Sequence, residues 1–102
     1  MAYKDIKARL ITCLKSGTYD HEMRKNINVK NLFQCGLVNE NFVITLLELT
    51  HEADYEQRVH HKAPEIDIHI FMPNINGTQW YVKCYFLQPK AVFISVHESG
   101  VK

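Results

Sequence analysis

Residues 65–97 carry the clearest alternation of apolar and polar positions in the chain. They read EIDIHIFMPNINGTQWYVKCYFLQPKAVFISVH, in which two turn signals, residues 73–77 and 88–90, separate three apolar runs. Each run is rich in β-branched and aromatic residues and alternates with period two, which is typical of strands. We therefore predict three antiparallel strands joined by short hairpins.

The same alternation assigns the side chains to two faces of the sheet, because successive residues of a strand point to opposite sides. The predicted apolar face holds Ile66, Ile68, Ile70, Trp80, Val82, Cys84, Phe86, Val92, Ile94 and Val96. The predicted polar face holds Asp67, His69, Phe71, Tyr81, Lys83, Tyr85, Phe93, Ser95 and His97. The expected rows across the strands are His69–Tyr81–His97 and Asp67–Lys83–Ser95, with Tyr85 opposite Phe93.

The residues before the sheet predict helices. An apolar stripe at helical spacing predicts a helix over residues 3–16, and a shorter helix is expected over residues 29–34, capped by Asn28. Asn39 begins a third helix, apolar nearly all round, which we expect to cover the sheet, and Thr50 caps a short helical turn. The predicted fold is α+β, a single domain over residues 1–102 in which two to three helices pack on one face of a small antiparallel sheet.

Composition limits the function classes. A chain of 102 residues suits one compact domain, and a net charge of +1 gives no bulk signal for nucleic-acid binding. The three cysteines are widely spaced, which favours free thiols in a reducing cytosol. The sequence shows neither a signal peptide nor an apolar run long enough to span a membrane, so a cytoplasmic protein without membrane contact is predicted.

The predicted polar face and the basic segment QRVHHKAP, residues 57–64, hold the residues that suit RNA cleavage without metal. Two histidines can share the acid and base roles, cations stabilise the phosphate, and Tyr positions it or stacks on a base. The candidate catalytic residues are His97, His69, Tyr81 and His60. The candidate RNA and phosphate contacts are Lys83, Lys62, Arg58, His61 and Gln57. The alternative is an ordinary solvated sheet face.

Two other chemistries are weakly supported. His51-Glu52 begins like a zinc-protease helix, but Tyr55 stands where the second histidine is needed. On a strand, the neighbouring His60 and His61 would point apart, so we expect neither metal nor cofactor. Ser95 and His97 share a strand face, but no strained turn is present to expose a serine nucleophile.

Four motifs together resemble the MqsR family of bacterial toxins. In order they are LLELTHEADYEQ, DIHIFMP, WYVKCYF and FISVHES, and they cover roughly residues 46–99. Members of that family are messenger-RNA endonucleases of RelE-like fold that belong to toxin–antitoxin pairs. The resemblance therefore implies an mRNA interferase that cleaves free RNA or RNA on the ribosome and has a cognate antitoxin protein as partner.

Carried over by position, Tyr81 and Lys83 match the Tyr-x-Lys of the family. His97 stands where the family has a lysine, Gln57 lies near another family lysine, and Ile68 or His69 lies near a glutamine. If activity persists, His97 and His69 take over the acid and base roles. The alternative is a non-catalytic protein-interaction module on the same fold.

Overall fold

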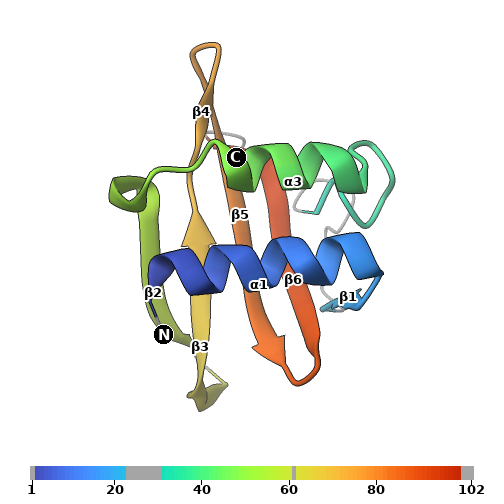
Figure 1. The fold of residues 1–102 in the computed structure, drawn as a ribbon, viewed down its shortest axis with the longest axis vertical. Coiled ribbons are helices and arrows are strands. Elements are labelled where there is room, and N and C mark those ends of the chain that lie inside the picture. The colour runs from blue at the N-terminus through green and yellow to red at the C-terminus, as the bar shows by residue number, and fades with distance from the viewer. Residues whose placement is uncertain (1, 23–30, 61, 100–102) are drawn as a thin grey trace.

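The computed structural model describes residues 2–22, 31–60 and 62–99 (Figure 1). In these residues two α-helices, α1 (Tyr3–Ser16) and α3 (Glu40–Glu48), cross one face of a six-stranded sheet, and a short 3-10 helix, η1 (Glu52–Asp54), precedes the second strand. The strands are β1 (Tyr19–His21), β2 (Tyr55–His60), β3 (Ala63–Phe71), β4 (Asn74–Ile75), β5 (Thr78–Leu87) and β6 (Lys90–Glu98). The predicted α+β class is confirmed.

The sheet has the strand order β1-β6-β5-β3-β2, and β4 extends the hairpin that leads into β5. β1 is parallel to β6, and the other neighbours are antiparallel, so the sheet is mixed instead of purely antiparallel. The sequence prediction lacked β1, β2 and β4. Residues 57–60 are four of the six residues of the edge strand β2, in which Gln57 pairs with His69.

α1 spans the predicted residues, and α3 begins at the predicted cap. Gly17 ends α1 with φ 73°, and its backbone N–H donates to the carbonyls of Cys13 and Leu14. Asn39 caps α3, because its side-chain oxygen accepts from the Phe42 N–H at 2.8 Å. An L-residue at φ 73° is strained, so Gly17 allows the chain to turn into β1.

Two shorter elements differ from the prediction. Thr50 does not cap a helical turn; its hydroxyl donates to the Leu46 carbonyl at 2.8 Å, and η1 follows His51 without a side-chain cap. Residues 28–30 lie outside the described part of the chain, and residues 32–36 form turns instead of a helix. Asn31 forms a parallel bridge with Val96.

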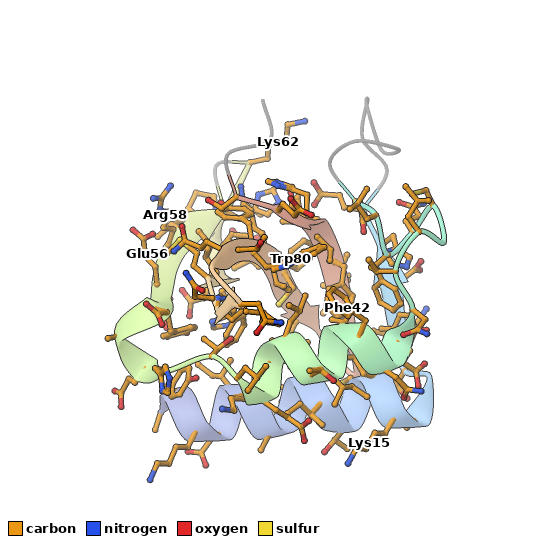
Figure 2. All side chains as sticks on the ribbon, turned by 90° about the horizontal axis from the view of Figure 1, so that it is seen from above. Lys15, Phe42, Glu56, Arg58, Lys62 and Trp80 are labelled. Carbon is orange, nitrogen blue, oxygen red and sulfur yellow. The ribbon has the colours of Figure 1, made fainter. Side chains whose placement is uncertain are left out.

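The main core lies between the helices and the sheet face that they cover, which we call the covered face. Its largest fully buried side chains include Phe71, Phe93, Leu10, Leu14, Leu46 and Leu47. Trp80 of β5 packs against Phe42 of α3 with ring centroids 4.9 Å apart (Figure 2). Burial of apolar area is the main stabilising term of such a core. Among the described residues, no helix combines the length and apolarity that crossing a membrane requires.

The first hairpin has a different register from the predicted one. Asn76 and Gly77, with φ 51° and 83°, form a two-residue turn that places Ile75 opposite Thr78. The ladder continues with His69 opposite Cys84, three residues from the predicted partner Tyr81. A shift by an odd number exchanges the faces of a strand.

The consequence is that β3 was assigned to the wrong faces. Ile68 and Ile70 lie on the sheet face away from the helices, which we call the open face, because Ile70 pairs with Lys83. Asp67, His69 and Phe71 belong to the covered face.

The second hairpin follows the prediction for half of its length. Tyr81 lies opposite His97 and Lys83 opposite Ser95, as expected. The register then shifts between Lys83 and Cys84, so Tyr85 pairs with Val92 and not with Phe93. Ile94 is the extra residue of this bulge. Phe93 moves to the covered face opposite Cys84, and Ile94 joins the open face.

Candidate functional site

The open face has an apolar floor. Ile68, Ile70 and Ile94 are buried there as a cluster separate from the main core, and Met72, Tyr81 and Tyr85 pack against them. The cluster forms because the turn at residues 76–77 and the bulge at Ile94 turn these isoleucines away from the helices. Polar groups therefore surround an apolar centre. Such a surface suits a ligand that has a flat apolar part and a charged part.

Tyr81 and His97 form the first part of the site. Their rings are nearly parallel, with centroids 5.2 Å apart and an angle of 19° between them. His97 Nδ1 lies 2.8 Å from the carbonyl oxygen of Glu98. Because a carbonyl only accepts, Nδ1 carries the proton and Nε2 is the nitrogen that remains for proton transfer.

Lys83 and the buried Ser95 form the next row, beside His97 and Tyr81. Lys83 also lines a pocket of about 210 Å³ on the open face. The other residues that line it are Glu22, Arg58, Val59, His60, Ile68 and Ile94. The pocket thus combines cations with the apolar floor.

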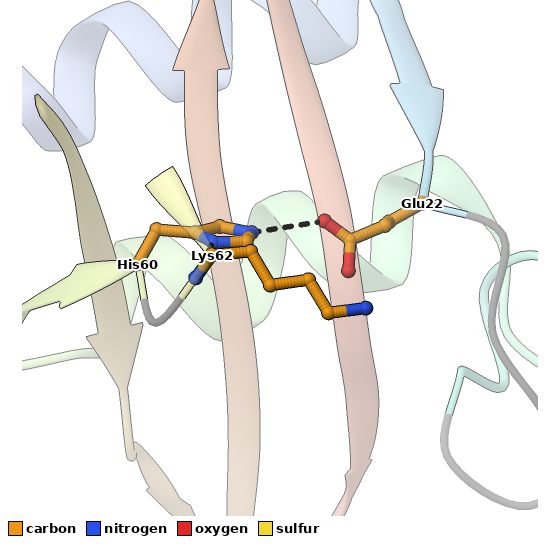
Figure 3. Close-up of polar contacts among 3 residues, drawn as sticks. All are labelled: Glu22, His60 and Lys62. Atoms are coloured by element: carbon orange, nitrogen blue, oxygen red, sulfur yellow. Dashed lines mark hydrogen bonds and ion pairs between the residues drawn. The ribbon is translucent and has the colours of Figure 1, made fainter. Parts of the chain in front are cut away.

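His60 and Glu22 close the far end of the open face (Figure 3). His60 Nε2 lies 3.3 Å from a carboxylate oxygen of Glu22. The two residues come from opposite edges of the sheet, since His60 ends β2 and Glu22 follows β1. In a flat sheet these edges would be about 19 Å apart. The contact therefore requires a strongly curled sheet, which makes the open face concave.

Both ring nitrogens of His60 have partners. The Lys62 N–H donates to Nδ1 at 3.1 Å, so the proton of the neutral ring is on Nε2 and faces Glu22. The Lys62 side chain points toward Glu22 (Figure 3). Burial, a hydrogen bond with Glu22 and its negative charge raise the pKa of Tyr85 to about 12. These contacts hold His60 in place.

The two ends of the open face are far apart. The His60 ring packs edge-on against Tyr85, with centroids 5.4 Å apart, whereas His97 stacks on Tyr81. Tyr81 and Tyr85 are four residues apart on β5, which is about 13 Å along a strand. His97 and His60 therefore lie near opposite ends of the groove and do not flank a single phosphate as an acid–base pair.

The remaining predicted residues are divided among several places. Arg58 projects from β2 on the open face and pairs with Glu56 at 3.1 Å; Glu56, Arg58 and Lys62 all lie away from the helices (Figure 2). The hydrogen bond and charge of Glu56 raise the pKa of the Arg58 guanidinium. His61 lies outside the described residues.

His69 and Gln57 are on the covered face, contrary to the prediction for His69. The Tyr55 hydroxyl lies 2.7 Å from His69 Nδ1 and donates to the Gln57 side-chain oxygen at 3.2 Å. Burial lowers the pKa of His69 below its usual value, although Asp67 opposes this effect. The sheet separates His69 from Tyr81 and His97.

Sequence reasoning missed Glu22 and Glu56 as members of the open face. Glu22 was part of a polar segment without a clear pattern, and only the closure of the sheet brings it to His60. Glu56 would have been found from the alternation of Tyr55, Gln57 and Val59 with Glu56 and Arg58, which signals a strand. Among the described residues, no group of three His, Cys, Asp or Glu side chains is arranged to hold a metal ion.

Comparison of the chain with protein-family models, curated proteins and solved structures finds no match. The likeness to the MqsR family therefore stays a resemblance of motifs.

Proposed function

We propose that this chain is a toxin of a toxin–antitoxin pair, an mRNA endonuclease of MqsR-like, RelE-like type that acts without metal on its open face. The observation that carries the proposal is the cross-strand arrangement of Tyr81, His97 and Lys83. Histidine, tyrosine and lysine within one concave, partly apolar surface suit a reaction in which a phosphate is held and protons are moved beside a nucleobase.

His97 performs the first step of the proposed reaction. Its Nε2 removes the proton of a 2′-hydroxyl, and the 2′-oxygen attacks the adjacent phosphorus. The Lys83 ammonium stabilises the charge on the phosphorane and donates a proton to the leaving 5′-oxygen, so the products are a 2′,3′-cyclic phosphate and a 5′-hydroxyl. Tyr81 positions the nucleotide beside His97.

The other cations of the open face bind the RNA strand on one side of the cleaved phosphate. Arg58 and Lys62 lie on the concave open face, toward the end at which His60 contacts Glu22. Phosphate contacts normally supply most of the affinity for nucleic acid, and a net charge of +1 gives few of them. We therefore expect the substrate to be mRNA presented by the ribosome, and the partner in the resting cell to be a cognate antitoxin.

The test is expression of the chain alone in a bacterium, beside a His97→Ala variant. We expect growth arrest with the wild type and normal growth with His97→Ala. Purified protein with translating ribosomes should cleave mRNA, and His97→Ala should lower the rate by about 10²-fold or more. His51→Ala is the matched control, because His51 is exposed and lies outside the open face.

Three outcomes separate the alternatives. Growth arrest by both proteins would support the toxin proposal but exclude His97 from its mechanism. Cleavage of free RNA that stops when EDTA is added would contradict metal-free chemistry. Normal growth with both, given soluble protein in each case, would favour the non-catalytic interaction module.

A further inference from the structure

A second cavity lies on the covered face, on the other side of the sheet from the proposed nuclease site. Its volume is about 280 Å³. It is lined by Ile6 and Arg9 of α1, Gln57 of β2, Asp67 and His69 of β3, and Phe86 of β5, among others. The size suits a single nucleobase or a molecule of similar dimensions.

His69 is the buried polar group of this cavity. The residue is only 6% exposed, yet it lines the pocket. Among residues 2–22, 31–60 and 62–99, the His69 ring has one hydrogen-bond partner, the Tyr55 hydroxyl at Nδ1. Nε2 has no partner in this part of the chain and is not fully enclosed, so a ligand in the cavity can reach it.

The neighbours of His69 determine which way its proton points. Burial raises the pKa of Tyr55 to about 12, so its hydroxyl stays protonated, and its single proton is donated to Gln57. The hydroxyl must then accept from His69 Nδ1–H. Burial lowers the pKa of His69, so the ring is neutral and its Nε2 is an acceptor.

The charges around the cavity favour a neutral ligand with two different edges. Arg9 lies over the Phe86 ring, with its guanidinium carbon 4.1 Å from the ring centroid, and supplies donors. Asp67 and the neighbouring Glu65, both exposed, supply acceptors. Two carboxylates oppose an anion, and the guanidinium opposes a cation. A planar molecule with donors on one edge and acceptors on the other satisfies both groups.

We propose that this cavity binds a guanine nucleobase. Asp67 accepts from N1–H and the exocyclic amine, Arg9 donates to O6 and N7, and His69 Nε2 accepts from the second amine proton. Arginine on O6 and N7 is the commonest specific contact to guanine. Adenine has no N1–H and presents a donor where guanine has O6. The proposal does not rest on RNA cleavage, because the cavity and His97 lie on opposite faces.

The test is an NMR titration of the full ¹⁵N-labelled chain with guanosine, adenosine, cytidine and arginine amide. We expect guanosine to shift the His69 Nε2 signal in a saturable manner and the other three compounds to leave it unchanged. Asp67→Asn should weaken guanosine binding about fivefold or more, because a bidentate contact contributes about 1–3 kcal/mol. Asp67 is exposed, so this variant should fold as the wild type does.

The matched control is Asp20→Asn, which removes an equally exposed carboxylate outside this cavity and should bind guanosine normally. His97→Ala should also bind guanosine, whether or not the wild type cleaves RNA, which separates this proposal from the nuclease. Equal shifts with guanosine and adenosine would contradict a guanine site, as would undiminished binding by Asp67→Asn. A stronger response to arginine amide would identify a cation site instead.

Discussion

His97 and His69 were expected to lie in one row on one sheet face, and the structure places them in opposite surroundings. His97 is partly exposed on the open face, stacks on Tyr81 and has a carbonyl on Nδ1. His69 is buried on the covered face against Tyr55. Two residues of one type, on the two strands that flank β5, therefore have different surroundings, because one faces solvent and the other faces the helices.

The difference originates in two short features of the chain and not in the histidines. The turn at Asn76 and Gly77 sets the register of β3 against β5, and the bulge at Ile94 sets that of the distal half of β6. Each changes which residues share a face. The alternation along a strand divides its side chains into two sets, one on each face. The turn determines which of the two sets packs against the helices.

The largest expected contrast is in stability. His69→Ala removes a buried ring and leaves the Tyr55 hydroxyl without that partner, so we expect it to lower the free energy of unfolding by about 2 kcal/mol. His97→Ala should change it by less than about 0.5 kcal/mol, since the ring is partly exposed. Urea unfolding followed by circular dichroism measures both. Similar decreases in the free energy of unfolding for the two variants would contradict the difference between the two faces.

A smaller effect is expected at the turn that separates the two histidines. Gly77 has φ 83° and open space around it, so in Gly77→Ala the strain comes from the backbone conformation and not from a clash. We expect a loss of about 1 kcal/mol in the same unfolding experiment. Gln79→Ala, an exposed change in the strand that follows, is the control. If Gly77→Ala left the free energy of unfolding unchanged, this result would argue against the turn and the register that it sets.

The smallest effect is the pH dependence of stability. Burial lowers the pKa of His69 and of His21 in the folded chain. The unfolded chain then binds more protons just below about pH 6.5, so the free energy of unfolding falls as pH decreases from 7 to 5. His69→Gln should make this decrease shallower, and the exposed His51→Gln should leave it unchanged. A steeper decrease in His69→Gln would contradict a neutral, buried ring.

Part of the fold could be predicted because its signals are local. The stripe of Ile6, Leu10 and Leu14 and the caps at Gly17 and Asn39 gave both helices, and strand alternation gave β3, β5 and β6. For the candidate site, the rows Tyr81–His97 and Lys83–Ser95 were predicted correctly. The Asn-Gly pair at residues 76–77 was also present as a signal for a two-residue turn and would have corrected the register of β3.

The sequence by itself determined the helices, the three central strands and the alternation within each strand, because these depend on side chains a few residues apart. Only the tertiary structure decided that Glu22 meets His60, since that contact requires the sheet to curl until its opposite edges touch. It also decided that His69 is buried beneath α1 while His97 remains at the surface. Register and curvature are cooperative properties of several strands, so they bring together residues that no local pattern connects.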